Sequence, residues 1–556
     1  MIQRLVQWLK TYGASVGFRI NASVFFVIAS ASTAVMWPIV AHEGWPLNHE
    51  GNGFFTRTHT YSQHIASGDV FPVWSSKDNF GFGSPQPVLY HKLFYLISGS
   101  VQSLFPQLSI ETIIAATIWV FLIIGAVGMY ALCRKVGVGS IHATSAAVML
   151  VAANYTITNW LIRGALAEFS AAMLVPWVLC VFIVSLHNHK FSSWLAVVLA
   201  LLFIAHSAIA FFVAVLLLAA MVVVCLRNRA YLAMFRWRVL VKPLLIGVAC
   251  ITPYALAMLQ LGRDYDLGRM TTAEYLPQNN FVRLSNYFND SVWHWGETYL
   301  RMTVEIGKPL IVLCAICLVG YFLTKIRKPN AVFNGIDRTA IAVVLVIGSS
   351  AALLQTKLST PIYRYFPGAS YIQFPWRLEA LLVPALIASC TIVLSKLQRK
   401  GTSVLLVVVA VSMLATAGSF AHIRYEWMTY QASDSDQLQF SAFNEYVPVS
   451  AGSFSQIRYP EILRFNAQNG CTLSTPQREV ESTERTYSVH CMGDALVVMP
   501  EFSSAAHRVQ IDTANRVRCI EDQKNPGLCA IRVNAGNHII HMHYPTLLGV
   551  LYSLIN

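Results

Sequence analysis

The chain has 556 residues, of which 55% are hydrophobic and 12% are charged, and its mean hydropathy is +0.51. This composition excludes a soluble globular protein, because repeated apolar runs near the length of a bilayer crossing are typical of a polytopic membrane protein. The net charge of +13 does not indicate nucleic-acid binding, since membrane proteins concentrate Lys and Arg in their cytoplasmic loops.

The apolar runs predict a helical membrane domain over residues 1–421 with about eleven transmembrane helices. The run 190–226 fits two spans or one long kinked helix. Lys and Arg gather in the short segments that become cytoplasmic when the N-terminus is inside, which fits the positive-inside rule. The first span has no small-residue cleavage site after it, so it is predicted to remain as an anchor. The predicted spans are residues 20–40, 109–133, 139–154, 170–187, 190–206, 207–226, 240–259, 306–325, 338–355, 378–396 and 402–421.

A long outer loop, residues 41–109, joins the first two predicted spans. It carries Glu50 a few residues beyond the first span and continues through Arg57 to Tyr90. Charged groups at a membrane boundary are costly to desolvate unless they are paired or used, so they are candidates for a functional site. We predict that Glu50 is a general base that removes a proton from an attacking hydroxyl. The alternative is a solvated loop carboxylate.

Further polar and aromatic segments fall on the same outer face in this topology, at residues 159–168, 206–207 and 373–377. Their arginines have the planar, permanently charged fork that suits phosphate oxygens. Structural alternatives remain open: a salt bridge at the start of a helix, an interface anchor, or a capping histidine. The predicted substrate-binding residues are Arg57, Tyr90, Arg163, Glu168, His206, Gln373, Trp376 and Arg377.

Asp264 and Asp266 form an Asp-x-Asp pair, which resembles a metal-binding pattern. This pattern is frequent by chance, and the surrounding loop is rich in charge. The two aspartates are therefore weak candidates for a divalent metal site, and no cofactor is predicted to be required.

The composition becomes polar from residue 422, which predicts a β-rich domain over residues 422–556. Alternating stretches at 486–490, 495–499 and 530–534 predict short strands of a small β-sandwich. Residues 534–537 are predicted to form a hairpin turn. The apolar residues 547–555 are too few to cross a bilayer.

Four cysteines lie in this polar region, whereas the other seven lie in or beside predicted spans. An even set in a region predicted to be outside suggests two disulfides in an oxidising compartment. Four cysteines allow three pairings, of which the sequential one is our prediction. A zinc site is the alternative, but no Cys-x-x-Cys or Cys/His spacing supports it. The predicted pairs are Cys471–Cys491 and Cys519–Cys529.

The chain carries an ordered set of motifs: Glu50, Arg57, 68–74, 81–85, Tyr90, 163–168, His206, 373–377, 497–500, 536–538 and 544–545. This set resembles bacterial polytopic membrane proteins related to 6-pyruvoyl-tetrahydropterin synthase, which are similar to GT-C glycosyltransferases. Two residues depart from the family pattern: Glu50 stands where Asp is usual, and Phe54 where His is usual. The longer Glu side chain carries its carboxylate about one methylene further.

The resemblance implies a GT-C fold in the bacterial inner membrane, with the N-terminus cytoplasmic and the C-terminal domain periplasmic. It implies a sugar donor on polyprenyl phosphate and a hydroxyl acceptor on a surface glycan or glycolipid. Glu50 would activate the acceptor, and Arg163, Arg377 and Arg57 would stabilise the phosphate leaving group. A lipid-linked glycan flippase or transporter and a non-catalytic envelope assembly factor are the alternatives. The flippase would favour paired halves with broken helices and a site at the membrane midplane.

Overall fold

The structure, a computed structural model, is described over most of the 556 residues. The described residues are 21–42, 45–46, 48–50, 53–265, 275–288, 306–327, 338–396, 398–420, 425–426, 446–452, 459–474, 483–504 and 506–555.

The chain forms two compact units, and each is built from segments that lie far apart in the sequence. The first comprises Met1–Gly51, Ala115–Cys250 and Glu274–Met428, and the second comprises Asn52–Ile114, Ile251–Ala273 and Thr429–Asn556. These units do not follow one cut near residue 421. The division into residues 1–421 and 422–556 therefore stays a prediction.

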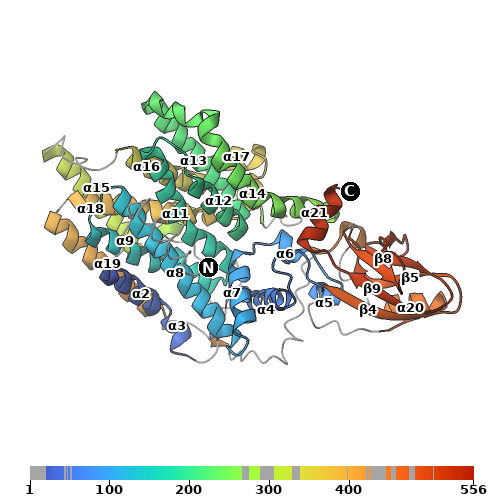
Figure 1. The fold of residues 1–556 in the computed structure, drawn as a ribbon. Coiled ribbons are helices and arrows are strands. Elements are labelled where there is room, and N and C mark those ends of the chain that lie inside the picture. The colour runs from blue at the N-terminus through green and yellow to red at the C-terminus, as the bar shows by residue number, and fades with distance from the viewer. Residues whose placement is uncertain are drawn as a thin grey trace. The chain divides into compact units, whose positions relative to one another are not determined.

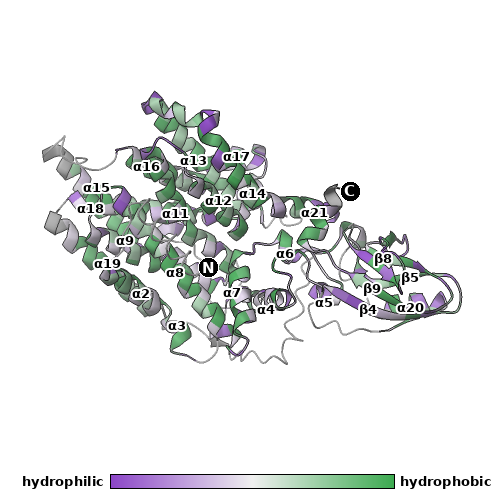
Figure 2. Ribbon diagram, in the orientation of Figure 1, coloured by the Kyte–Doolittle hydropathy of each residue, from purple (hydrophilic) through white to green (hydrophobic). Residues whose placement is uncertain are grey.

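The first unit is a bundle of helices (Figure 1). α11 and α18 are largely buried in it, whereas α14 and α19 expose most of their apolar side chains. Figure 2 shows hydrophobic residues along these helices, as expected for a bundle in lipid. The longer helices that lie wholly or partly in it are α2 (Ala22–Val35), α8 (Ile110–Lys135), α9 (Ser140–Val151), α11 (Leu166–His187), α12 (Ser193–Ala205), α13 (Ser207–Arg227), α14 (Trp237–Leu261), α15 (Lys308–Arg327), α16 (Arg338–Leu354), α18 (Glu379–Lys396) and α19 (Gln398–Phe420).

Short helical segments connect these helices. They are α3 (Trp37–Val40), α10 (Asn154–Ile157), η1 (Thr158–Ile162), η2 (Arg229–Phe235), η6 (Pro277–Asn279), η7 (Leu284–Phe288), η9 (Lys357–Ser359), α17 (Thr360–Tyr365), η10 (Ala369–Ile372) and η11 (Pro375–Leu378). A two-stranded pair, β1 (Trp45–Pro46) with β2 (Tyr425–Glu426), also belongs to this unit.

The predicted count of eleven spans is not confirmed. Among the described residues, six helices are long and apolar enough to cross a membrane, or up to eight if each of two bent pairs is one span. Three predicted spans coincide with shorter apolar helices, for example α2 with 14 residues. An α-helix of that length rises about 21 Å, less than the roughly 30 Å of a bilayer core. The run 190–226 forms two helices, α12 and α13, which meet at His206.

The predicted outer loop contains helices that the sequence pattern did not indicate. α4 (Gly53–Ala66) packs against α7 (Leu93–Leu104), and the hydroxyls of Thr58 and Ser98 are 3.0 Å apart. Two short helices lie between them, α5 (Asp78–Gly81) and α6 (Gln86–Leu89). All four belong to the second unit, together with η3 (Gly262–Asp264) at the end of α14.

The C-terminal part of the second unit contains two antiparallel sheets, with strand orders β3-β4-β9-β6 and β5-β8-β7. The predicted strands at 486–490, 495–499 and 530–534 coincide with β4, β5 and β8. The predicted hairpin at 534–537 is wrong, because β8 and β9 belong to different sheets and this turn links the sheets. The elements are η14 (Val449–Ala451), α20 (Tyr459–Gln468), β3 (Cys471–Leu473), β4 (Glu484–Cys491), β5 (Ala495–Phe502), β6 (Arg508–Ile511), β7 (Ile520–Glu521), β8 (Leu528–Val533), β9 (Gly536–His543) and α21 (Leu547–Ile555).

The two sheets share one apolar core, and the first outer loop contributes Trp74 and Phe82 to it. The backbone N–H of Phe502 donates to Phe82 O at 2.8 Å. Gly83 has φ +83°, and a Cβ there would lie 2.6 Å from the Trp74 indole nitrogen. Only glycine therefore suits this turn, which explains part of the Gly81–Pro85 motif.

The core also holds a buried ion pair. The Glu501 carboxylate accepts hydrogen bonds from Arg485 at 2.9 Å, from the Tyr487 hydroxyl at 2.5 Å and from the Tyr544 hydroxyl at 2.8 Å. Arg485 also donates to Gly81 O at 2.7 Å. These bonds compensate the desolvation of both charges and tie the loop residue Gly81 to the sheets.

Both predicted disulfides are confirmed, Cys471–Cys491 and Cys519–Cys529. The first joins directly opposed residues of β3 and β4. The second links the segment before β7 to β8.

We predict that His507 makes the C-terminal region acid-sensitive. Burial, with the nearby charge of Arg508, lowers the pKa of His507 to about 3 from its usual 6.5. The folded protein therefore keeps this imidazole neutral while the unfolded chain takes up a proton, so stability falls as the pH drops from about 6.5 towards 3. Each pH unit in this window corresponds to about 1.4 kcal/mol.

Unfolding of the wild type and of His507→Phe, followed from pH 7 to pH 4, measures this contribution. The variant should have a flatter pH dependence in that window, even if its stability at pH 7 changes. His490→Phe is the control, since His490 is exposed on β4. Equal slopes for wild type and His507→Phe would contradict a buried neutral His507.

Candidate functional site

α9 and the segment Asn154–Ile162 form one of the two bent helix pairs. The candidate site lies where this pair ends and α11 begins. α10 continues into η1, a π-helical turn, and such turns are frequent at functional sites. Arg163 follows η1, and Gly164 then adopts φ +66° before α11 starts at Leu166. This reversal places Glu168, on the first turn of α11, beside the Arg163 side chain.

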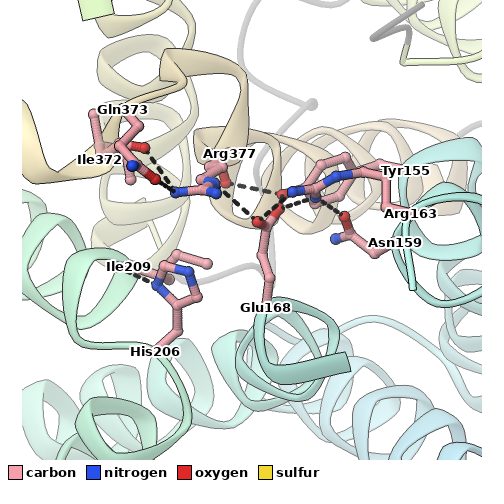
Figure 3. A network of polar contacts seen from close by, with 9 residues as sticks. All are labelled: Tyr155, Asn159, Arg163, Glu168, His206, Ile209, Ile372, Gln373 and Arg377. Carbon is pink, nitrogen blue, oxygen red and sulfur yellow. Dashed lines mark hydrogen bonds and ion pairs between the residues drawn. The ribbon is translucent and has the colours of Figure 1, made fainter. Parts of the chain in front are cut away.

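Glu168 is the centre of a buried polar network (Figure 3). Arg163 donates two parallel hydrogen bonds to its carboxylate, at 2.6 and 2.9 Å. Arg377 forms a second ion pair with it, with Nε 3.0 Å from Oε2. The Tyr155 hydroxyl donates to Glu168 at 2.7 Å. Only 2% of the Glu168 side chain is exposed, so the carboxylate that the two guanidinium groups share is desolvated.

Arg377 is held by the turn that precedes α18. Its Nη1 donates to Gln373 Oε1 at 2.9 Å and to Ile372 O at 3.1 Å. Gln373 has φ +60°, a strained conformation for a residue other than glycine. Such strain persists only where the surroundings enforce it, and it is common at functional sites.

Aromatic rings cover both guanidinium groups. Arg163 lies over the Trp376 ring at 4.3 Å, and Arg377 lies over the Phe374 ring at 5.0 Å. Trp376 is buried, so it packs inside the unit instead of forming an interface anchor only. Stacking of this kind fixes the guanidinium planes without consuming their hydrogen-bond donors.

Glu50 is attached to this network through the backbone. Its N–H donates to Arg163 O at 3.1 Å, and the His49 N–H donates to Ile162 O at 3.1 Å. A Cβ on Gly164 would lie 3.0 Å from Glu50 Cβ and 2.5 Å from Asn48 Oδ1. The Glu50 segment therefore approaches the chain at Gly164 as closely as a glycine permits.

The pKa of Arg163 reflects the carboxylates around it. Burial alone would lower the pKa of the Arg163 guanidinium, but Glu168 and, more weakly, Tyr155 and Glu50 raise it. Arg163 therefore stays charged, with Glu168 as its hydrogen-bonded partner and Glu50 as a weaker electrostatic one.

The first unit thus brings together six predicted site residues, whose functional roles stay predictions: Glu50, Arg163, Glu168, Gln373, Trp376 and Arg377. His206 caps α13, with Nδ1 accepting from the Ile209 N–H at 3.3 Å, so it has a structural role of its own. In the second unit, Arg57 lies over the Tyr90 ring at 4.2 Å.

The metal candidates gain no support from the structure. Asp264 is exposed at the end of α14, and Asp266 lies outside the described residues. Across the described chain, no group of three or more His, Cys, Asp or Glu side chains is placed to hold a metal ion.

Tyr155 and Asn159 belong to the network, although no role for either is predicted from the sequence. Tyr155 joins Glu168 to Arg377, since its hydroxyl also lies 3.1 Å from Arg377 O. Asn159 accepts a short hydrogen bond from Arg163. The available signal was weak: both are uncharged polar residues at the end of an apolar run, where their hydrogen-bonding groups need partners.

No family model and no curated protein matches the chain. The relation to 6-pyruvoyl-tetrahydropterin synthase therefore stays a resemblance. Solved structures do match. A mycobacterial arabinofuranosyltransferase, AftD, is 15% identical with a TM-score of 0.48, over 72% of this chain and 26% of that one.

The Archaeoglobus fulgidus oligosaccharyltransferase AglB, solved with an inhibitory peptide and a dolichol-phosphate, is 11% identical with a TM-score of 0.45. The match covers 79% of this chain and 61% of that one. The chain thus spans about a quarter of the first protein and about three fifths of the second. Similarity at this level assigns neither a reaction nor a substrate to the chain.

We predict that Glu168→Gln destabilises the first unit strongly. The substitution keeps the shape of the side chain but leaves two buried guanidinium charges without their shared carboxylate. Removing one partner of a buried ion pair destabilises a protein by about 3–5 kcal/mol. Thermal unfolding of the purified protein in detergent measures the loss. Asp264→Asn, which neutralises an exposed carboxylate, is the control; equal melting temperatures for both variants would contradict the network's structural role.

Proposed function

We propose that the protein is a membrane glycosyltransferase that moves a sugar from a polyprenyl-phosphate donor to a hydroxyl of a surface glycan or glycolipid. The observation that carries this proposal is the attachment of the Glu50 segment to Arg163, within a site where two arginines share one carboxylate. In this proposal Glu50 is the base and the two arginines bind the phosphate leaving group.

The charge of the network supports an anionic ligand. Arg163 and Arg377 carry two positive charges, which Glu168 and the neighbouring Glu50 balance before reaction. Once Glu50 takes the acceptor proton, one positive charge is left for the phosphate leaving group. Arg163 uses three of its five N–H groups in the hydrogen bonds described above. In the described part of the chain, the other two have no protein acceptor. Phosphate oxygens match such donors, and guanidinium groups bind them with charge-assisted hydrogen bonds.

The proposed reaction is a single displacement at the anomeric carbon. Glu50 takes the proton of the acceptor hydroxyl as its oxygen attacks, the new carbon–oxygen bond forms, and the bond to the phosphate oxygen breaks. The electron pair of that bond stays on the lipid phosphate, where Arg163 and Arg377 stabilise the added charge. In-line attack opposite the leaving group inverts the anomeric configuration.

The remaining candidates have supporting roles in this proposal. Glu168, Gln373 and Trp376 position the two arginines through the contacts already described. Arg57 and Tyr90 form a cation–aromatic pair in the second unit, which suits a sugar ring or a second anionic group of a substrate. His206 contributes by shaping the junction of α12 and α13.

The disulfides support a location on the outer side. Cys471–Cys491 and Cys519–Cys529 are bonded, whereas the free cysteines all lie in the helices. Disulfides persist in oxidising compartments. We therefore propose that the C-terminal region faces the periplasm of a bacterial inner membrane and that the N-terminus is cytoplasmic.

We predict that Glu50→Gln abolishes most of the transfer while the protein still folds. The amide cannot accept the acceptor proton, and loss of a general base lowers the rate by about 10²–10⁴-fold. Purified protein in proteoliposomes, with a panel of radiolabelled polyprenyl-phosphate sugars and an extract of surface glycans, measures the transfer. Glu111→Gln is the control, because Glu111 is a similarly half-buried carboxylate at the start of α8.

Two outcomes would contradict the proposal. A transfer rate for Glu50→Gln equal to that of Glu111→Gln would exclude Glu50 as the base. Wild-type protein that moves labelled lipid between the bilayer leaflets without transferring sugar would instead identify a flippase.

A further inference from the structure

We propose that α21 and the neighbouring residues Val70 and Phe71 form a lipid-contacting surface that docks the C-terminal sheet region onto the bilayer. This inference rests only on contacts inside the second unit and is independent of the proposed reaction.

α21 presents one face to the protein and another to its surroundings. Val550 is fully buried, whereas Leu548 and Tyr552 are 80% and 70% exposed. Because residues four apart share a helix face, these two large side chains form one exposed apolar stripe. The nine described residues of α21 rise about 13 Å, less than half of a bilayer core, so this segment suits a position along the membrane surface.

The start of α21 is fixed against the first outer loop. Thr546 forms an isolated antiparallel bridge with Pro72. Two residues away, the Tyr544 and Trp74 rings are stacked, with centroids 6.5 Å apart. Val70 and Phe71, which immediately precede Pro72, are 51% and 48% exposed. They therefore lie beside the first residues of α21 and extend its apolar surface.

Phe71 in turn contacts a helix that is long and apolar enough to cross the membrane. Its ring meets the Tyr254 ring of α14 edge-on, with centroids 6.1 Å apart. The Lys92 ammonium lies 4.1 Å from the centre of the same ring. Tyr254 and Lys92 are both buried, so these contacts fix Phe71 against α14.

The apolar surface of α14 continues beyond Tyr254. Leu256 and Leu259 are 37% and 64% exposed, and charged residues follow only at Arg263 and Asp264. Arg263 is the ninth residue after Tyr254, which corresponds to a rise of about 13 Å. A bilayer that covers these leucines therefore also reaches Phe71, which contacts Tyr254. Because Pro72 pairs with Thr546, the start of α21 lies next to Phe71 and at the same membrane surface. Lipid is for this reason the occupant that the contacts favour.

Photocrosslinking in the full chain tests this proposal. The photoreactive residue p-benzoylphenylalanine replaces Leu548 or Tyr552, and the protein is placed in nanodiscs of phosphatidylethanolamine and phosphatidylglycerol. Met492, which is 82% exposed in the turn after β4, receives the same residue as the control. After irradiation, intact mass spectrometry measures the fraction of protein that carries a lipid adduct.

We expect at least a tenfold larger lipid-adduct fraction at positions 548 and 552 than at position 492. Introducing Leu548→Asp into the Tyr552 probe should reduce that fraction several-fold, because a carboxylate opposes insertion of the stripe. Adduct fractions equal to that of the Met492 control would overturn the proposal. Crosslinks from position 548 or 552 to a second copy of the chain or to another protein would also overturn it.

Discussion

The Glu168 carboxylate is shared by two guanidinium groups in a nearly dry environment, and the arrangement of the candidate site depends on this bond network. One arginine would be enough to neutralise the charge of the Glu168 carboxylate. The second arginine adds a positive charge that the nearby Glu50 balances, while aromatic rings and the Gln373 amide hold both cations in place. At this one side chain two neighbouring segments, α10–η1 and the start of α11, are joined to η11, which lies far along the sequence.

The same principle recurs in the second unit with a different balance of charge. Glu501 faces a single arginine, Arg485, and two tyrosine hydroxyls complete its hydrogen bonding. The Arg485–Glu501 pair is neutral and connects the sheets to the loop at Gly81, as expected for a structural role. The cluster around Glu168 contains two arginines and has a second carboxylate, Glu50, beside it. This second carboxylate beside two arginines is the physical reason for proposing the chemistry in the first unit.

Sequence reasoning predicted the grouping of Arg163, Glu168 and Arg377, because charged residues beside apolar runs need partners on a common face. It also predicted the cysteine pairs and three strands, since alternation and even counts are local signals. The prediction of a hairpin at 534–537 was wrong because turn residues indicate only that the chain changes direction. They do not indicate whether the two flanking strands, β8 and β9, pair with each other. α4 and α7 were missed because their polar and aromatic residues become buried largely through contacts with each other. The count of eleven spans is not confirmed among the described residues, because apolar runs do not reveal where a helix ends or bends.

The candidate site is sensitive to substitution of Gly164. Any side chain there would push against Asn48 and Glu50, and its left-handed backbone disfavours other residues as well. A change at this uncharged position would therefore separate the carboxylate from the arginine while leaving every ionisable group of the protein intact. Glu50 and Arg163, more than a hundred residues apart in the sequence, are thus constrained as one unit, and their spacing is set by the smallest side chain of the site.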